Sequence, residues 1–477
     1  MYKNNNIIIY SACFTVLCGF IVRFYNLNFE NLWFDEIVSF WISDPEISFF
    51  ESYQRNNSGE GTPFLFNFLL KILHIIFGYN PNVGRYFSCI LSALSIFTMI
   101  ILAKTIKKNN FYLLIIFLVS LNIFLIQYSQ ELRVYSLVFF LCSMTLVFYF
   151  RMLEENIKNK YLSTNSFYFI IFHILSILSH PFVLIIFGSI ILYAISLRIF
   201  KKKINKPLYL SIFFIFIFII FYVPYYLINT EPYPSWISHP NAKFYTNFYF
   251  SKFFGSRILG LSHILILFFL IFKFKEKFVK KLEPSTTLIF IIFFSYLVPI
   301  SFGYLYQPIL APRYIIFVLI PILILISYLT FELNNKKLKY FIIITISLLT
   351  LGNLWTETTI KQFFKERPSH KPQYRLALNN IHLSSHKNYS VNMSFARKNK
   401  EYFNNAIINY FQKLILKDNL NIQYINIKQA KNDSHFWSIC LIDIKDSDCE
   451  KININNSYNI LQEQNYNSVN LRLIKVD

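Results

Sequence analysis

The sequence predicts a polytopic α-helical membrane protein that ends in a small α/β domain. Of its 477 residues, 55% are hydrophobic and only 15% are charged, which is too apolar for a soluble enzyme of this length. Apolar runs long enough to cross about 30 Å of hydrocarbon recur along the first three-quarters of the chain. They predict about 11 spans, at residues 7–23, 84–103, 111–127, 134–150, 166–180, 182–200, 208–228, 257–273, 286–304, 314–331 and 340–356.

The basic residues predict the orientation of these spans. Lysines and arginines gather in the connections that follow every even-numbered span, and the positive-inside rule assigns those connections to the cytoplasm. Membrane topology thereby accounts for most of the net charge of +21, so the charge does not indicate nucleic acid binding. The opposite, extracytoplasmic face then receives the polar loops at residues 24–83, 127–133, 229–256 and 307–313, together with the C-terminal region.

The first extracytoplasmic loop, residues 24–83, holds two predicted interfacial helices. The apolar run 64–77 has only about 14 residues, fewer than a span needs, and Lys71 within it can extend toward lipid headgroups. A second such helix is expected at 34–50. It would hold the adjacent carboxylates of Asp35 and Glu36 at membrane height.

Two interpretations of Asp35 and Glu36 are open from the residues alone. Carboxylates favour helix N-termini, so the pair could simply cap a helix. The flanking Trp33 and Trp41 place it at the lipid interface, where an ionised group is costly without a partner or a water-filled pocket. The second interpretation makes the pair part of a functional site.

A second polar cluster lies in the short loop between the third and fourth spans. It contains Tyr128, Glu131 and Arg133. The two charged residues could pair at the surface, a contact that contributes little. Alternatively, because the loop is so short, it holds these side chains close together in a substrate site.

Four other positions are candidates for substrate binding. Arg313, followed by Tyr314, sits at an extracytoplasmic span boundary, where the planar guanidinium suits a phosphate oxygen and where snorkelling is the alternative. Arg85 raises the same question. His180 and Glu60 are each interpreted either as turn residues or as contributors to the site.

In this order along the chain, these motifs resemble the GT-C superfamily of membrane glycosyltransferases. Within it, they resemble the family that includes bacterial relatives of protein O-mannosyltransferases and the aminoarabinose transferases of lipid A. The resemblance covers roughly residues 1–356. It rests on the stretches Leu32-Trp33-Phe34-Asp35-Glu36, Pro63-Phe64-Leu65, Gly84-Arg85-Tyr86-Phe87-Ser88, Tyr128-Ser129-Gln130-Glu131-Leu132-Arg133-Val134-Tyr135-Ser136-Leu137, Ser179-His180 and Pro312-Arg313-Tyr314.

The resemblance implies inverting transfer of a sugar, a hexose or a pentose, from a polyprenyl-phosphate donor to a lipid, glycan or protein acceptor. The setting would be the bacterial inner membrane, with the chemistry at its extracytoplasmic face, in lipopolysaccharide or protein glycosylation for the cell envelope. Asp35 would be the general base or would organise a metal, Glu36 would support it, and Arg313, with Arg133 or Arg85, would bind the lipid phosphate. Oxygen ligands of this kind suit Mg²⁺ or Mn²⁺. These side chains are expected to converge in one wet cavity.

Residues 357–477 differ in composition from the membrane module 1–356, because polar residues rise and apolar runs shorten. Strand-like stretches at 389–393, 421–427, 436–444 and 469–476 and a helical pattern near 398–416 predict a small extracytoplasmic α/β domain. It is expected to shape acceptor access. Cys440 and Cys449 lie in this region, and their spacing leaves open whether they form a disulfide.

A polytopic transporter or lipid flippase without transferase activity is the alternative function. Such a protein would also have many spans and buried charges, but repeated halves and charges in mid-membrane are expected of it. The charges discussed above cluster instead at one rim of the predicted bundle.

Overall fold

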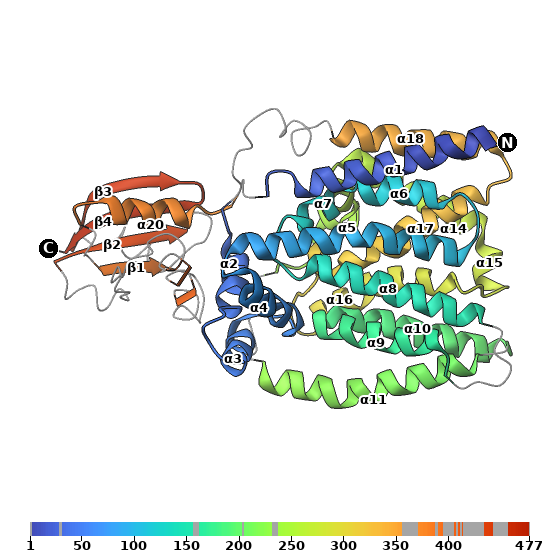
Figure 1. Ribbon diagram of the computed structural model, residues 1–477, viewed down its shortest axis with the longest axis horizontal. Coiled ribbons are helices and arrows are strands. Elements are labelled where there is room, and N and C mark those ends of the chain that lie inside the picture. Colours follow the sequence, from blue (N-terminus) through green and yellow to red (C-terminus); the bar gives the residue numbers. More distant parts are fainter. Residues whose placement is uncertain are drawn as a thin grey trace. The chain divides into compact units, whose positions relative to one another are not determined.

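The structure is a computed structural model that describes residues 2–27, 31–155, 162–202, 205–230, 237–354, 371–386, 390–394, 405–406, 409–410, 413, 434–441 and 457–476 (Figure 1). The chain divides into two compact units. Unit 1 comprises Met1–Tyr25, Thr62–Phe66 and Arg85–Glu366. Unit 2 comprises Asn26–Gly61, Asn67–Gly84 and Arg367–Asp477.

Unit 1 is a bundle of apolar helices. Its elements are α1 (Tyr2–Phe24), α5 (Pro81–Ile106), α6 (Tyr112–Ser120), α7 (Ile123–Ser129), α8 (Tyr135–Glu154), α9 (Thr164–Ser179), η1 (Pro181–Val183), α10 (Leu184–Ile199), α11 (Lys206–Asn229), α12 (Ala242–Tyr245), α13 (Phe250–Phe254), α14 (Arg257–Lys273), α15 (Lys275–Val279), α16 (Thr286–Leu305), η2 (Pro312–Val318), α17 (Leu319–Phe331) and α18 (Lys336–Leu354).

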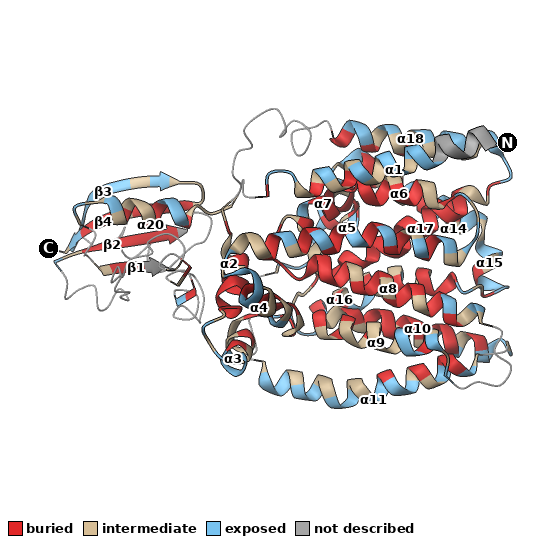
Figure 2. Ribbon diagram, in the orientation of Figure 1, coloured by how far each residue is buried: buried red, intermediate tan, exposed pale blue. Residues whose placement is uncertain are grey.

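Among the described residues, seven helices are long and apolar enough to cross a membrane, and the bent pair α6–α7 makes an eighth if it is one span. The protein is therefore a multi-pass membrane protein. The other three predicted spans coincide with α1, α9 and α14, which do not meet that criterion, so a count of 11 is not confirmed. In the span that contains α17, 89% of the apolar stretch is buried, and this span lies at the centre of the bundle (Figure 2). In α11 only 11% of the apolar stretch is buried, so this helix exposes its apolar side chains.

The predicted span 111–127 is broken. Helices α6 and α7 meet at 53°, and Asn122 caps α7 by accepting a hydrogen bond from the Leu125 N–H. The carbonyls of Val119 and Ser120, which end α6, accept hydrogen bonds of 2.9 and 2.7 Å from the buried guanidinium of Arg23. An arginine of α1 thus satisfies backbone groups that would otherwise lack partners in an apolar setting.

Helix α1 approaches α6 closely at Gly19. A Cβ at this position would lie 2.7 Å from the Cβ of Ser120, which is closer than two carbon atoms can pack. The absence of a side chain lets Arg23, one turn further along, reach the end of α6, and its guanidinium also donates to the Gly19 carbonyl at 2.9 Å. Small residues at such crossings are typical of membrane helices.

Unit 2 contains three short helices from the first loop, namely α2 (Phe34–Ile42), α3 (Phe49–Gly59) and α4 (Leu65–Phe77). Helix α4 matches the predicted helix 64–77, but its Lys71 does not extend toward headgroups. The side chain is 1% exposed and donates to the carbonyls of Asp44 and Ile47. The single helix expected at 34–50 was also wrong, because Pro45 follows α2 and Ser48 caps a separate helix α3.

The C-terminal region contributes helix α20 (Tyr374–Leu383) and a four-stranded sheet in the order β1 (Ser390–Ser394), β2 (His435–Leu441), β4 (Val469–Val476), β3 (Tyr458–Tyr466). Strand β1 pairs with β2 in parallel, and the other pairs are antiparallel. The predicted strands 389–393, 436–444 and 469–476 correspond to β1, β2 and β4 within the described residues. The predicted strand 421–427, most of the predicted helix 398–416, and Cys449 lie outside them. Cys440 is disulfide-bonded.

Candidate functional site

The carboxylates of Asp35 and Glu36 lie in the first turn of α2, where they complement the positive end of the helix dipole. The Asp35 side chain is half-buried. The Glu36 side chain is fully buried, accepts a hydrogen bond from the Trp33 N–H at 3.3 Å and pairs with the ammonium of Lys371 at 3.0 Å. The two neighbours therefore differ in how far their side chains are buried.

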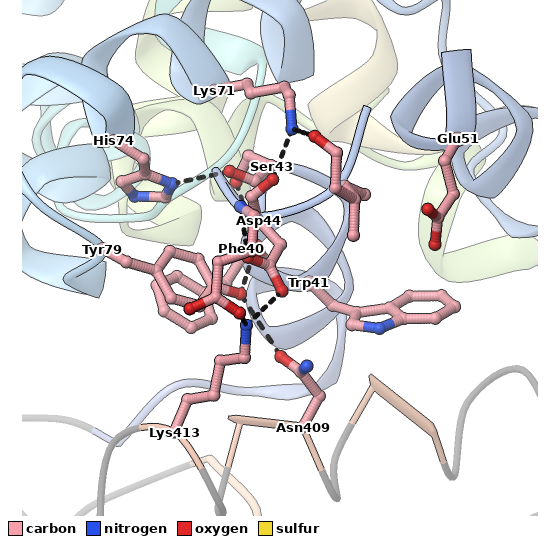
Figure 3. A network of polar contacts seen from close by, with 12 residues as sticks. Phe40, Trp41, Ser43, Asp44, Glu51, Lys71, His74, Tyr79, Asn409 and Lys413 are labelled. Carbon is pink, nitrogen blue, oxygen red and sulfur yellow. Dashed lines mark hydrogen bonds and ion pairs between the residues drawn. The ribbon is translucent and has the colours of Figure 1, made fainter. Parts of the chain in front are cut away.

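The opposite end of α2 is held by an unusual set of hydrogen bonds (Figure 3). Helix C-termini leave carbonyls without intrahelical partners. Here five consecutive carbonyls, from Phe40 to Asp44, each accept from a side chain contributed by α3, α4 or the turn after α4. The donors are Tyr79 to Phe40, Arg55 to Trp41, Ser52 to Ile42, His74 to Ser43 and Lys71 to Asp44.

The hydrogen bond from His74 indicates which nitrogen of its ring is the donor. Nδ1 lies 3.2 Å from the Ser43 carbonyl, which can only accept, so Nδ1 carries the proton. Nε2 is buried. Burial lowers the pKa of His74 to about 4, so the ring is neutral at physiological pH.

Glu60, the third acidic candidate, is the C-cap residue of α3 and is 7% exposed. Its N–H donates to the Asn56 carbonyl at 2.9 Å. Glu60 therefore lies in the turn that ends α3, which is the turn position that one of the two interpretations of the sequence predicts.

In unit 1, four of the predicted residues gather with Tyr135. The guanidinium carbons of Arg133 and Arg313 lie 6.0 and 5.9 Å from the centroid of the Tyr135 ring. The Tyr314 ring lies 6.5 Å from that of Tyr135 and 5.3 Å from that of His180. The predicted short loop and the residues ahead of α17 thus share one aromatic cluster with two guanidinium groups, a suitable setting for an anion.

The loop after α7 is not a surface feature. Glu131 and Arg133 are 6% and 5% exposed, so an exposed ion pair does not describe them. Gln130, between Tyr128 and Glu131, holds this loop against the end of α1. Its side-chain amide donates hydrogen bonds to the carbonyls of Val22, Arg23 and Tyr25. Arg85, in α5, is also buried, at 3% exposed.

A pocket of about 450 Å³ opens beside Arg313. It is lined by Tyr128, residues 310–313 and the loop between α11 and α14, in particular Ile237, Ser238, His239, Pro240, Asn241, Lys243, Phe244, Asn247, Tyr249, Ser251 and Lys252. Tyr249 fixes one wall by donating to the Leu310 carbonyl at 3.0 Å. Three permanent cations, Arg313, Lys243 and Lys252, and no carboxylate line it among the described residues. This balance favours a phosphate group.

His239, Lys243 and Lys252 were not among the residues singled out from the sequence. The signal was present, because lysines in a loop predicted to be extracytoplasmic break the positive-inside bias as Arg313 does. The loop 229–256 is long and its apolar content is irregular, so nothing in its pattern indicated that it folds back against residues 310–313.

Among the described residues, no group of three or more His, Cys, Asp or Glu side chains is arranged to hold a metal ion. Of the two predicted ligands, Glu36 is paired with Lys371.

No protein-family model matches the sequence, and no curated protein matches it in sequence. Solved structures do. ArnT from Cupriavidus metallidurans in the apo state matches with a TM-score of 0.65 and 9% identity over 99% of this chain and 98% of that one. Its complex with undecaprenyl phosphate matches with a TM-score of 0.59 and 10% identity over 97% of both chains.

The archaeal oligosaccharyltransferase AglB from Archaeoglobus fulgidus, in complex with an inhibitory peptide and a dolichol-phosphate, matches with a TM-score of 0.52 and 12% identity over 93% of this chain and 70% of that one. Against the complex of the A. fulgidus oligosaccharyltransferase with Zn and sulfate, the TM-score is 0.50 at 12% identity, and this chain spans 61% of that length. At these identities the comparisons establish the fold. The chain has the fold of the GT-C membrane glycosyltransferases.

Proposed function

We propose that the protein transfers a sugar from a polyprenyl-phosphate donor to an acceptor hydroxyl at the extracytoplasmic face of the bacterial inner membrane. The observation that carries the proposal is the pocket beside Arg313 on a GT-C fold, which is lined by three cations and, among the described residues, by no carboxylate. The neighbouring ArnT and AglB structures hold undecaprenyl phosphate and a dolichol-phosphate, so a lipid phosphate is the anion that we assign to this pocket.

The proposed reaction is a single displacement. The acceptor oxygen forms a bond to the anomeric carbon while the bond from that carbon to the phosphate oxygen breaks, and the electron pair leaves with the lipid phosphate. The acceptor proton goes to the carboxylate of Asp35, the half-buried member of the acidic pair. One displacement inverts the configuration at the anomeric carbon. Arg313, Lys243 and Lys252 stabilise the charge on the departing phosphate.

Several finer assignments belong to this proposal. We assign 11 spans by counting α6–α7 as one span and by including α1, α9 and α14, which pack against other apolar helices of unit 1. We also assign residues 1–356 to the transferase module and 357–477 to a domain that governs acceptor access. Two sets of assignments stay predictions. They are Mg²⁺ or Mn²⁺ at Asp35 and Glu36, and contributions to substrate binding from Arg85, Arg133, Glu131, Tyr128, His180, Tyr314 and Glu60.

The test uses purified protein in lipid nanodiscs with a panel of polyprenyl-phosphate sugars. Mass spectrometry of envelope glycans from cells with and without the protein first identifies the transferred sugar and its acceptor. Transfer by the wild-type protein and its loss in Asp35→Asn support the assignment. If the protein moves a lipid-linked sugar across a vesicle membrane without transferring the sugar, the flippase alternative is correct. If Asp35→Asn turns over as fast as the wild type, the role assigned to the Asp35 carboxylate is rejected.

A further inference from the structure

Helix α2, which carries Asp35, is too short to be stable alone. It has nine residues, whereas isolated helices shorter than about 12 residues are marginal in water. The direction in which α2 presents Asp35 therefore depends on what holds its two ends. Both ends lie within unit 2, and each is held by a lysine from the C-terminal region.

At the first turn of α2, the partner of Glu36 is Lys371, which lies just ahead of α20. The ammonium is 3.0 Å from the Glu36 carboxylate, and the side chains are 14% and 0% exposed. The ammonium also lies 6.0 Å from the centroid of the Trp33 ring, immediately before the helix. Because Glu36 adjoins Asp35 in the same turn, this ion pair sets the rotation of the turn.

Beyond the last turn, the partner of Asp44 is Lys413 (Figure 3). The ammonium is 2.8 Å from the Asp44 carboxylate, which is 2% exposed. Two further contacts come from the same part of the chain. Asn409 accepts a hydrogen bond of 3.3 Å from the Tyr79 hydroxyl, and the Tyr410 ring packs edge-on against Phe40 at 6.0 Å.

A buried carboxylate is costly unless a cation compensates it. At the end of α2, Lys71 and Arg55 of the first loop donate to backbone carbonyls. The ammonium groups that form ion pairs with the carboxylates of Glu36 and Asp44 come from the C-terminal region, one at each end of the helix.

We propose that Lys371 and Lys413 are positioning residues, which hold the two ends of α2 and so fix the direction of the Asp35 carboxylate. The inference rests on the proposed function, since it concerns the same carboxylate. The C-terminal region would then contribute to the rate of the reaction without contacting the reacting atoms. A displacement of about 1 Å in a reacting group lowers a rate by about 100-fold, so loss of either lysine is expected to act on kcat.

The experiment compares Lys371→Met and Lys413→Met with the wild-type full-length protein. Methionine keeps the apolar stem and removes the charge. We expect kcat per folded molecule to fall about 10- to 100-fold, while KM for the lipid donor changes by less than about threefold. Arg472→Met is the matched control, because it breaks an ion pair of 3.1 Å with Glu463 between β3 and β4 in the same unit. It should leave kcat unchanged.

Two further variants separate positioning from folding. Lys413→Arg retains the charge and should keep kcat within about threefold of the wild type, since an Arg–carboxylate pair replaces the Lys pair. Lys413→Gln removes the charge but keeps a polar side chain, and it should lower kcat as Lys413→Met does. If Lys413→Met does not yield folded protein, Lys413→Gln decides. A folded Lys413→Gln variant that is as fast as the wild type would overturn the proposal.

Hydrogen exchange of the α2 amides provides a readout that needs no sugar transfer. If the backbone amides of residues 37–42 exchange faster in Lys371→Met and Lys413→Met but not in Arg472→Met, the two lysines hold the ends of α2 as proposed. Unchanged exchange in both lysine variants would refute this. If the wild-type protein transfers no sugar while hydrogen exchange responds as expected, the proposed function is wrong but the two lysines still hold α2. The failure of one proposal can therefore be distinguished from the failure of the other.

Discussion

The guanidinium carbon of Arg313 lies 5.9 Å from the centre of the Tyr135 ring. Tyr135 begins α8 and Arg313 lies in η2, so the contact joins the two polar stretches that the sequence places 178 residues apart (313 minus 135). Since Arg313 also lines the cationic pocket, the ring of Tyr135 helps to orient the group that we assign to the lipid phosphate.

Replacing Arg313 by alanine should weaken donor binding by at least about tenfold, because a charge-assisted contact to phosphate contributes about 1.5–3 kcal/mol. Binding is measured by the shift in thermal unfolding that a polyprenyl phosphate produces, with the uncharged polyprenol as the reference. Lys337→Ala, at the exposed start of α18, is the control and should leave the shift intact. An undiminished shift in Arg313→Ala would exclude this pocket as the phosphate site.

The pocket lysines should act together with Arg313. Lys243→Gln and Lys252→Gln should each raise the dissociation constant for polyprenyl phosphate several-fold, by about 1 kcal/mol or less for a partly solvated charge. The loss should shrink as salt concentration rises, because mobile ions screen exposed charges. A salt titration of donor affinity checks this. Affinities that depend on salt equally in the wild type and in both variants would contradict it.

Asp35 and Glu36 should respond differently to removal of their charge. Asp35→Asn should lower kcat by about 100- to 10,000-fold with little effect on stability, as expected for a general base. Glu36→Gln leaves the Lys371 ammonium largely buried beside an amide and should destabilise the protein, by about 3 kcal/mol on the scale of broken buried pairs. Paired measurements of turnover and thermal unfolding distinguish the two. Identical profiles would contradict the difference in environment.

Arg23 and Gly19 should be essential for the packing of α1 against α6. Arg23→Met leaves the carbonyls of Val119 and Ser120 without their donor and should cost about 1–3 kcal/mol for each. Gly19→Leu should be at least as harmful, since even a Cβ there meets Ser120 at 2.7 Å. Gly188→Ala in α10 is the matched control, because a Cβ there has nothing within 4 Å. The unfolding temperatures of the three variants are compared in detergent. Equal unfolding temperatures would contradict the described packing of α1 against α6.

His74 should make stability depend on pH. Its folded pKa of about 4 lies below the value of about 6.5 expected in an unfolded chain, so the unfolded state binds more protons between these values. Stability is then complete above about pH 6.5 and is lost as the pH falls toward 4, by up to about 3 kcal/mol. Unfolding measured between pH 7 and 4.5 should lose part of this slope in His74→Gln. An unchanged slope would show that other groups cause it.

Long apolar runs made much of the bundle predictable, because hydrophobic length determines where a helix can cross a membrane. The break at Asn122 was not predictable, since it depends on Arg23 from another helix to satisfy the end of α6. Strand β3 was missed for a related reason. Its sequence, YNILQEQNY, has no regular alternation, and it forms because it pairs with the more apolar β4 as an exposed edge.

The candidate site was predictable where a residue type is unusual for its place, as with Arg313 and the Asp35–Glu36 pair. It was not predictable where a partner lies far along the chain. Lys371 and Lys413 have nothing in their local sequence that distinguishes them from the other lysines of a lysine-rich tail. Only the fold of unit 2 shows that they face buried carboxylates.

The pairing of α2 with the tail has a consequence for biogenesis. The partners of Glu36 and Asp44 are 335 and 369 positions downstream, so a ribosome has made nearly every span before either lysine leaves its tunnel. Until then Glu36 and Asp44 lack the two lysines that pair with them in the folded chain. A nascent or prematurely terminated chain would insert its spans before these two ion pairs can form at the ends of α2.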